Sequence, residues 1–123
     1  MPRVTIRRHP CQVSRAQVIA IRDAMPGIVA STLRVQPEEV EVLVRDFGEM
    51  DINIAPLGID ILTGSGRKDD WRLKRRQELS VEIERTLFKT GLIKRTWVNR
   101  RSYVWLMVVG SSFVPFGSPE LRR

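Results

Sequence analysis

Two successive strand–helix–strand patterns constrain the fold of this chain more than any other feature. Alternating apolar residues at 2–8 and 40–45 flank one amphipathic helix, and apolar segments at 51–63 and 102–109 flank another. A strand, a crossover helix and a return strand normally form a right-handed parallel unit. Two such βαβ units predict an α+β fold, a four-stranded mixed sheet with two helices on one face. The alternative is that two amphipathic helices resemble each other by chance.

The first unit has the clearer pattern. Val4 and Ile6 alternate with polar residues, Ser14 is a suitable N-cap, and apolar residues then recur at helical spacing. This apolar stripe consists of Val18, Ile21, Met25, Ile28 and Val29. Pro26 lies inside it and removes a backbone donor. Because the stripe keeps its phase across Pro26, we expect one kinked helix rather than two.

The second unit is less regular. Pro56 falls within the apolar segment 51–63, so we expect an interrupted strand there. Asp69 or Asp70 is expected to cap the second helix, which runs to about Lys89.

The last strand leaves one face of the sheet unexplained. Residues 102–109 are apolar on both sides of the strand, a pattern typical of strands that are buried on both faces. Two helices cover only one face of the sheet. We therefore expect the other face to be buried by oligomerisation.

The length of 123 residues fits one domain, which we place at 1–117, with pseudo-repeats at about 2–50 and 51–110 and a basic tail at 118–123. No apolar run is long enough for a membrane helix, and the N-terminus lacks the apolar core of a signal peptide. A single cysteine, Cys11, excludes an internal disulfide and a cysteine-cluster metal site. We expect a cytoplasmic protein with no metal site.

Basic residues outnumber acidic ones by 21 to 14, giving a net charge of +7. This excess favours an anionic partner, such as nucleic acid, an acidic membrane surface or a carboxylate substrate. A basic cluster at 94–101 supports a nucleic-acid-binding module as one alternative. However, Tyr103 and Trp105 lie among Leu106, Met107 and Val108, a composition that suits packing better than stacking on bases.

Pro2 is the strongest candidate for catalysis. Once Met1 is removed, Pro2 becomes a secondary amine at the start of a strand. An α-amino group has a pKa of about 7.7–8.0, which apolar surroundings and nearby arginines lower. Such an amine would act as a base near neutral pH on a carbon acid beside a carbonyl. The alternative is that this proline only assists N-terminal processing.

Met1-Pro2 opening a strand, the βαβ repeat and the loop Gly64-Ser65-Gly66-Arg67 together resemble the tautomerase superfamily. This superfamily includes 4-oxalocrotonate tautomerase, 5-carboxymethyl-2-hydroxymuconate isomerase and macrophage migration inhibitory factor. The resemblance implies a tautomerase-like trimer whose sheets line a central barrel. It also implies a cofactor-free keto–enol tautomerase or isomerase that acts on a small unsaturated 2-oxo or 2-hydroxy carboxylate, with Pro2 as general base.

Arginines are expected to bind the carboxylates of this small anionic substrate. The resemblance implies Arg67 in the glycine-rich loop. Arg45 is a second candidate, because it lies at the end of the second strand, from where it could reach the same site. One residue departs from the pattern: short tautomerases have Val-Arg-Val in the second strand, whereas this chain has Val40-Glu41-Val42. Glu41 would repel a dianion, so a different activity, or an inactive oligomeric protein of this superfamily, is a further alternative.

Overall fold

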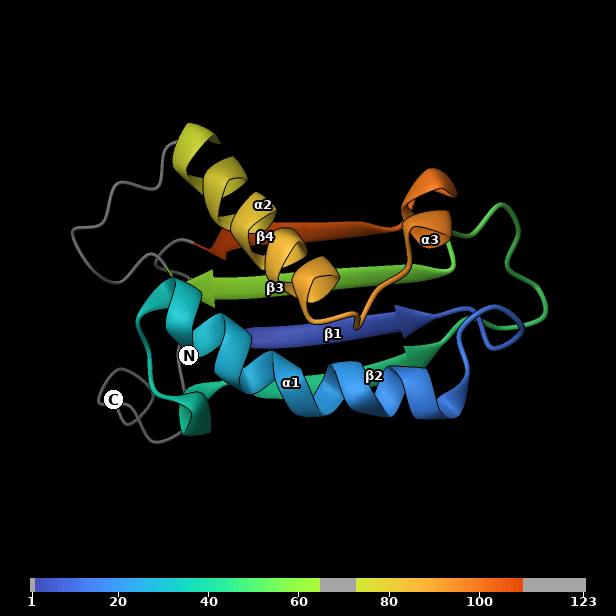
Figure 1. Cartoon of the computed structure of the whole chain (residues 1–123), viewed down its shortest axis with the longest axis horizontal. Coiled ribbons are helices and arrows are strands. Elements are labelled where there is room, and N and C mark those ends of the chain that lie inside the picture. Colours follow the sequence, from blue (N-terminus) through green and yellow to red (C-terminus); the bar gives the residue numbers. More distant parts are fainter. Residues whose placement is uncertain (1, 65–72, 110–123) are drawn as a thin grey trace, which may run out of the picture.

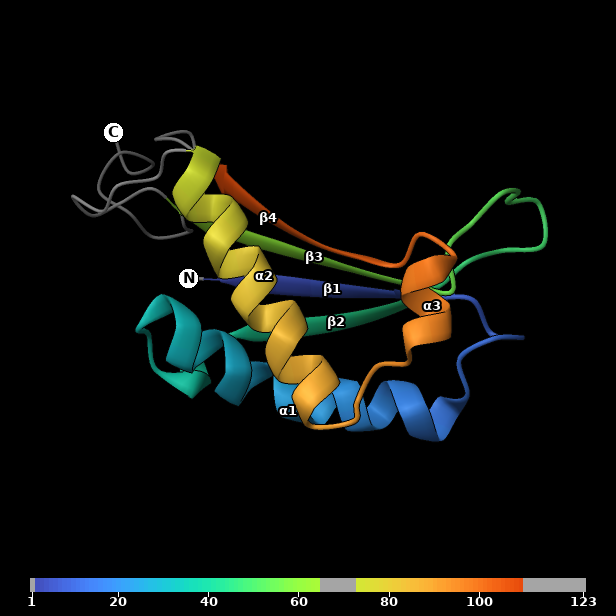
Figure 2. The same ribbon diagram turned by 45° about the horizontal axis from the view of Figure 1, so that its top comes forward.

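The computed structural model describes residues 2–64 and 73–109, which form one four-stranded sheet with the strand order β2-β1-β3-β4. The elements are β1 (Arg3–Arg8), α1 (Arg15–Leu33), the short 3-10 helix η1 (Pro37–Glu39), β2 (Glu41–Asp46), β3 (Leu57–Gly64), α2 (Leu73–Lys89), α3 (Arg95–Asn99) and β4 (Tyr103–Val109). Strands β1 and β2 are parallel, as are β3 and β4, and β1 pairs with β3 antiparallel. Both long helices cover the same face of the sheet (Figures 1 and 2). The predicted mixed α+β fold is confirmed.

The first helix forms as its sequence predicts. The hydroxyl of Ser14 accepts a hydrogen bond from the backbone of Gln17 at 3.1 Å, and the Gln17 side chain accepts one from the backbone of Ser14 at 2.7 Å. This reciprocal capping box satisfies two amide groups that lack partners within the helix. Helix α1 continues through Pro26, and Figure 1 shows that it bends along its length.

The second unit corrects one prediction. Instead of an interrupted strand that begins near residue 51, β3 begins at Leu57, directly after Pro56. The preceding residues form a loop, in which the Asp51 side chain accepts a hydrogen bond from the backbone of Gly48 at 2.7 Å. Asn53 there has a left-handed φ of 57°, which a strand does not allow. The expected cap residues of α2, Asp69 and Asp70, lie outside the described residues.

The short helix α3 is not predicted by the sequence, in which residues 94–101 stand out only as a basic cluster. Helix α3 carries Trp97, which is 5% exposed and belongs to the core. A helix of one turn has too few residues to show a periodic pattern.

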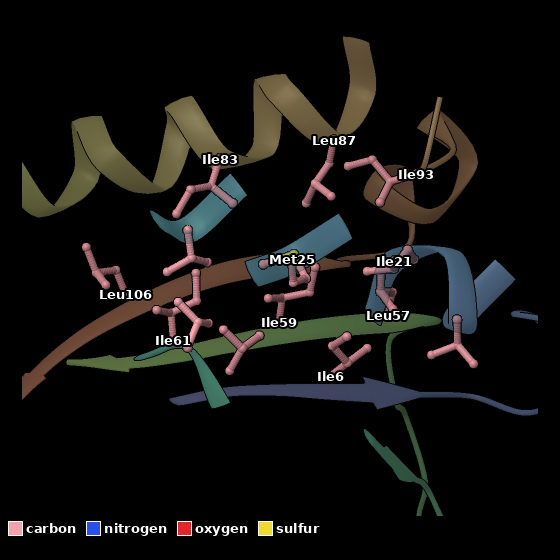
Figure 3. Packing of buried hydrophobic residues seen from close by; sticks show 14 of the residues in the cluster. Ile6, Ile21, Met25, Leu57, Ile59, Ile61, Ile83, Leu87, Ile93 and Leu106 are labelled. Carbon is pink, nitrogen blue, oxygen red and sulfur yellow. The ribbon is translucent and has the colours of Figure 1, made fainter. Parts of the chain in front are cut away.

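The core lies between the sheet and the two long helices. Val4 and Ile6 of β1 and Ile59 and Ile61 of β3 are at most 1% exposed. Figure 3 shows labelled sheet residues such as Ile59 and Ile61 pointing towards α1 and α2. Ile21, Met25, Ile83 and Leu87 complete this contact from the helices. The side chains that alternate with these residues along each strand point to the other face of the sheet, which no helix covers.

The uncovered face combines aromatic and charged side chains. Tyr103 and Trp105 of β4 are 40% and 59% exposed. The Tyr103 ring lies across Gly58, where an added Cβ would come within 2.7 Å of it. Arg7 binds Asp60 on the neighbouring strand, with 2.8 Å between Nε and Oδ2. This is the sheet face that the sequence predicts to be buried by oligomerisation, and it is open in the described part of the chain.

Candidate active site

Pro2 directly precedes β1, one of the two inner strands of the sheet. Its carbonyl oxygen accepts a hydrogen bond from the backbone of Glu41 at 3.0 Å, and its ring is fully buried. Extending the strand register by one residue brings Pro2 level with Val40, which directly precedes β2, and with Thr63 on β3. Both of these neighbours are 8% exposed, so the Pro2 ring lies in a largely apolar environment.

An ion pair stands directly beside Pro2. Arg3 Nε lies 3.1 Å from Glu41 Oε2, and the two side chains are 52% and 44% exposed. Glu41 is therefore an exposed residue of the edge strand whose charge is balanced by Arg3. This pairing reduces the repulsion that Glu41 alone would exert on an anion. Arg3 was not among the predicted site residues, although the parallel pairing of the two strands predicts that it faces Glu41.

The predicted glycine-rich loop begins at the same end of the sheet. Gly64 is the last residue of β3 and follows Thr63, which lies level with Pro2. Arg67 itself lies outside the described residues.

Arg45 lies at the other end of the sheet. It pairs in register with Arg7, near the carboxyl end of β1, whereas Pro2 precedes the start of that strand. At a rise of about 3.3 Å per residue, the two ends are about 16 Å apart along the strand. The structure therefore does not bring Arg45 and Pro2 of one protomer together. Arg45 instead lines a groove between α1 and β2.

Asp60 connects two side chains on the open face of the sheet. Its Oδ2 binds Arg7, while its Oδ1 is buried without a hydrogen-bond partner among the described residues. Tyr103 lies beside this cluster. Burial raises the pKa of Tyr103, and the negative charge of Asp60 raises it further. The phenol is thus held in its neutral form.

Within the described residues, no group of three or more histidines, cysteines, aspartates or glutamates is arranged to hold a metal ion. Cys11 is exposed, and its backbone donates to His9 Nδ1 at 3.2 Å, so both residues belong to a turn. None of the helices in this part of the chain is long and apolar enough to span a membrane.

No family model matches the sequence, and a search of curated proteins finds no match. Solved structures do match. A native fused 4-OT superposes with a TM-score of 0.67 at 13% identity, covering 98% of this chain and 99% of the other. A structure of Pt0534 inactivated by 2-oxo-3-pentynoate superposes with a TM-score of 0.63 at 16% identity, covering 94% of this chain and 93% of the other. A member of the cis-3-chloroacrylic acid dehalogenase family gives 0.61 at 12% identity, covering 94% and 81%.

These structural neighbours are tautomerase-superfamily proteins, so the resemblance predicted from the sequence is confirmed at the level of the fold. Other fused 4-OT structures with the same likeness are described as symmetric or asymmetric trimers. At such low identity, shared architecture does not transfer substrates or catalytic residues.

Proposed function

We propose that this protein is a cofactor-free keto–enol tautomerase or isomerase, with Pro2 as general base after removal of Met1. Its substrate class would be small unsaturated 2-oxo or 2-hydroxy carboxylates. The observation that carries the proposal is the position of Pro2, a buried ring at the start of an inner strand of a tautomerase-like fold.

The surroundings of Pro2 suit a base that is neutral near pH 7. An apolar site disfavours the charged form of an amine and lowers its pKa. The free nitrogen would take a proton from the carbon next to the substrate carbonyl, or from the 2-hydroxyl of an enol substrate. It would return that proton to the conjugated carbon, which shifts the double bond. Arg67, the residue that the resemblance implies for substrate binding, would bind the carboxylate and stabilise the enolate charge.

Assembly is part of the proposal. A trimer formed through the open sheet face would bury Tyr103 and Trp105, and the trimeric fused 4-OT structures support this arrangement. Because Arg45 lies at the far end of its own protomer from Pro2, it would reach a Pro2 site only in a neighbouring copy.

Nucleic-acid binding on the open face is the alternative function. The exposed Trp105 favours it, since bases stack on aromatic side chains. Arg3 and Arg7 on the same face are each paired with a carboxylate, which leaves less positive charge for phosphates. The tautomerase proposal therefore has the stronger support.

The test compares the native protein with Pro2→Ala, with Pro10→Ala in an exposed turn as the control. Intact mass establishes whether Met1 is removed. We expect the native protein and Pro10→Ala to turn over phenylenolpyruvate or 2-hydroxymuconate and to gain mass with 2-oxo-3-pentynoate. Pro2→Ala should lose about 10²–10⁴-fold in rate, the usual contribution of a general base.

Two outcomes contradict the proposal. One is retention of Met1 in the native protein, which blocks the amine. The other is equal turnover or equal labelling of native protein and Pro2→Ala. Binding of a single-stranded RNA with a steep salt dependence, in the absence of turnover, would favour the alternative function.

A further inference from the structure

A groove on the outer edge of the sheet, remote from Pro2, is lined by arginines. It lies between α1 and the edge strand β2 and has a volume of about 420 Å³. Arg15 and Arg22 reach it from the helix, and Arg8 and Arg45 from the ends of β1 and β2. A volume of this size is typical of sites for small organic ligands.

The helix forms its wall of the groove from one continuous face. The lining residues of α1 follow helical spacing, so their side chains lie side by side. They are Arg15, Val18, Ile19 and Arg22. Val18 is 4% exposed, and Ile19 and Val44 are half-buried, so the floor of the groove is apolar while its rim carries the guanidinium groups.

The charges in the groove do not balance. Among the described lining residues, Asp46 is the only carboxylate, and Arg8 holds it through two hydrogen bonds of 2.9 and 2.7 Å. The Arg8 guanidinium keeps the pKa of that carboxyl below its usual value, so Asp46 stays ionised and paired. Arg22 binds Asp23, its exposed neighbour on the helix, and Arg45 donates to the Val44 carbonyl.

These contacts leave most of the arginine donors unused. A guanidinium has five N–H groups, and an exposed ion pair such as Arg22–Asp23 is weak because water screens it. Arg15, Arg22 and Arg45 therefore present an excess of positive charge around an apolar floor. An anion with a compact apolar body satisfies both features at once.

We propose that this groove binds a small organic dianion, in which two carboxylates or one phosphate group are attached to a compact apolar body. Within one protomer the groove is separate from the proposed catalytic site, because Pro2 lies about 20 Å from Arg8 along β1. The proposal thus goes beyond the proposed function and does not depend on it.

The test uses isophthalate and phenyl phosphate as probes, titrated into the full chain by calorimetry and by amide NMR. The variant is Arg15→Gln/Arg22→Gln, which removes two exposed charges without touching the core. The matched control is Arg75→Gln/Arg85→Gln on the exposed side of α2, with the same change in net charge. We expect saturable binding of at least one probe, weakened tenfold or more in the groove variant and less than twofold in the control.

The two probes separate the sources of the dianion, since preference for isophthalate indicates a dicarboxylate and preference for phenyl phosphate a phosphate ester. Pro2→Ala should bind the preferred probe as tightly as the native protein, which separates this proposal from the catalytic one. If the groove variant and the control variant both bind the probe equally more weakly than the native protein, the proposal is overturned, because the effect is then one of net charge alone. Saturable binding of neither probe would also overturn it, as would binding of a single-stranded RNA alone.

Discussion

The two faces of the sheet are built from the same strands and differ in almost every other respect. On the helix-covered face, Val4, Ile59 and Ile61 are at most 1% exposed and are packed by aliphatic side chains from both helices. On the other face, Trp105 is 59% exposed and Asp60 carries a buried oxygen without a partner among the described residues. The first face is complete within one protomer, whereas the second has the features of an interface that one protomer leaves unfilled.

The largest effect is expected on the covered face. Ile61→Ala removes a fully buried side chain from the centre of the sheet and leaves a cavity against the helices. We expect a loss of about 2–5 kcal/mol in the free energy of unfolding, measured by urea denaturation. The control is Val81→Ala on the exposed surface of α2, which should change stability by about 0.5 kcal/mol or less. Similar losses in the two variants would contradict the contrast between the faces.

On the open face, the expected effect is on assembly rather than on the protomer. Trp105→Ser removes the most exposed aromatic side chain of β4 and with it much of the apolar area available to a second copy. Analytical ultracentrifugation should show a trimer for the native protein and smaller species for Trp105→Ser. Val81→Ser, which removes an exposed apolar side chain from α2 instead of from the sheet, should remain trimeric. A native protein that is monomeric at all concentrations would show that this face is not an interface between copies.

The smallest effect concerns the single tyrosine of the chain. Because burial and Asp60 raise the pKa of Tyr103, its titration followed by phenolate absorbance should have a midpoint above about 10. Because the fold favours the neutral phenol, Tyr103 contributes to the stability of the folded protein below about pH 10. This contribution is lost as the pH rises through the higher pKa that Tyr103 has in the folded state. Trp105→Ser should lower the midpoint, because it exposes Tyr103 to water. Equal titration midpoints in the native protein and Trp105→Ser would mean that Trp105 does not shield Tyr103 from water.

Most of the fold could be predicted from the sequence because its signals are local. The alternation of Val4 and Ile6 and the capping box at Ser14 depend only on near neighbours in the chain. The errors arose where local signals were weak or in conflict. The apolar residues Ile52 and Ile54 resembled a strand before Pro56, but the turn at Gly48 and the left-handed Asn53 place them in a loop, with Ile52 81% exposed.

The site could be predicted less well because it depends on how strands are placed beside one another. The sequence position of Pro2 alone makes it a candidate base, but that its ring is buried is known only from the structure. The separation of Arg45 from Pro2 follows from the parallel pairing of β1 and β2, which aligns the start of one strand with the start of the other. The predicted βαβ unit already implies this parallel pairing, and with it the distance between Arg45 and Pro2. The groove, by contrast, required the side chains of α1 to be placed against β2.

The antiparallel pairing of β1 with β3 has a consequence for how this architecture could be divided. Each βαβ unit contributes one inner strand, and in the described part of the chain the pairing of these two strands is the one that joins the units within the sheet. A backbone break in the exposed loop between β2 and β3 would leave each fragment with one unsatisfied edge whose complement is the other fragment. The chain therefore consists of two βαβ units connected by one loop, a geometry that suits it to reassembly from two separate fragments.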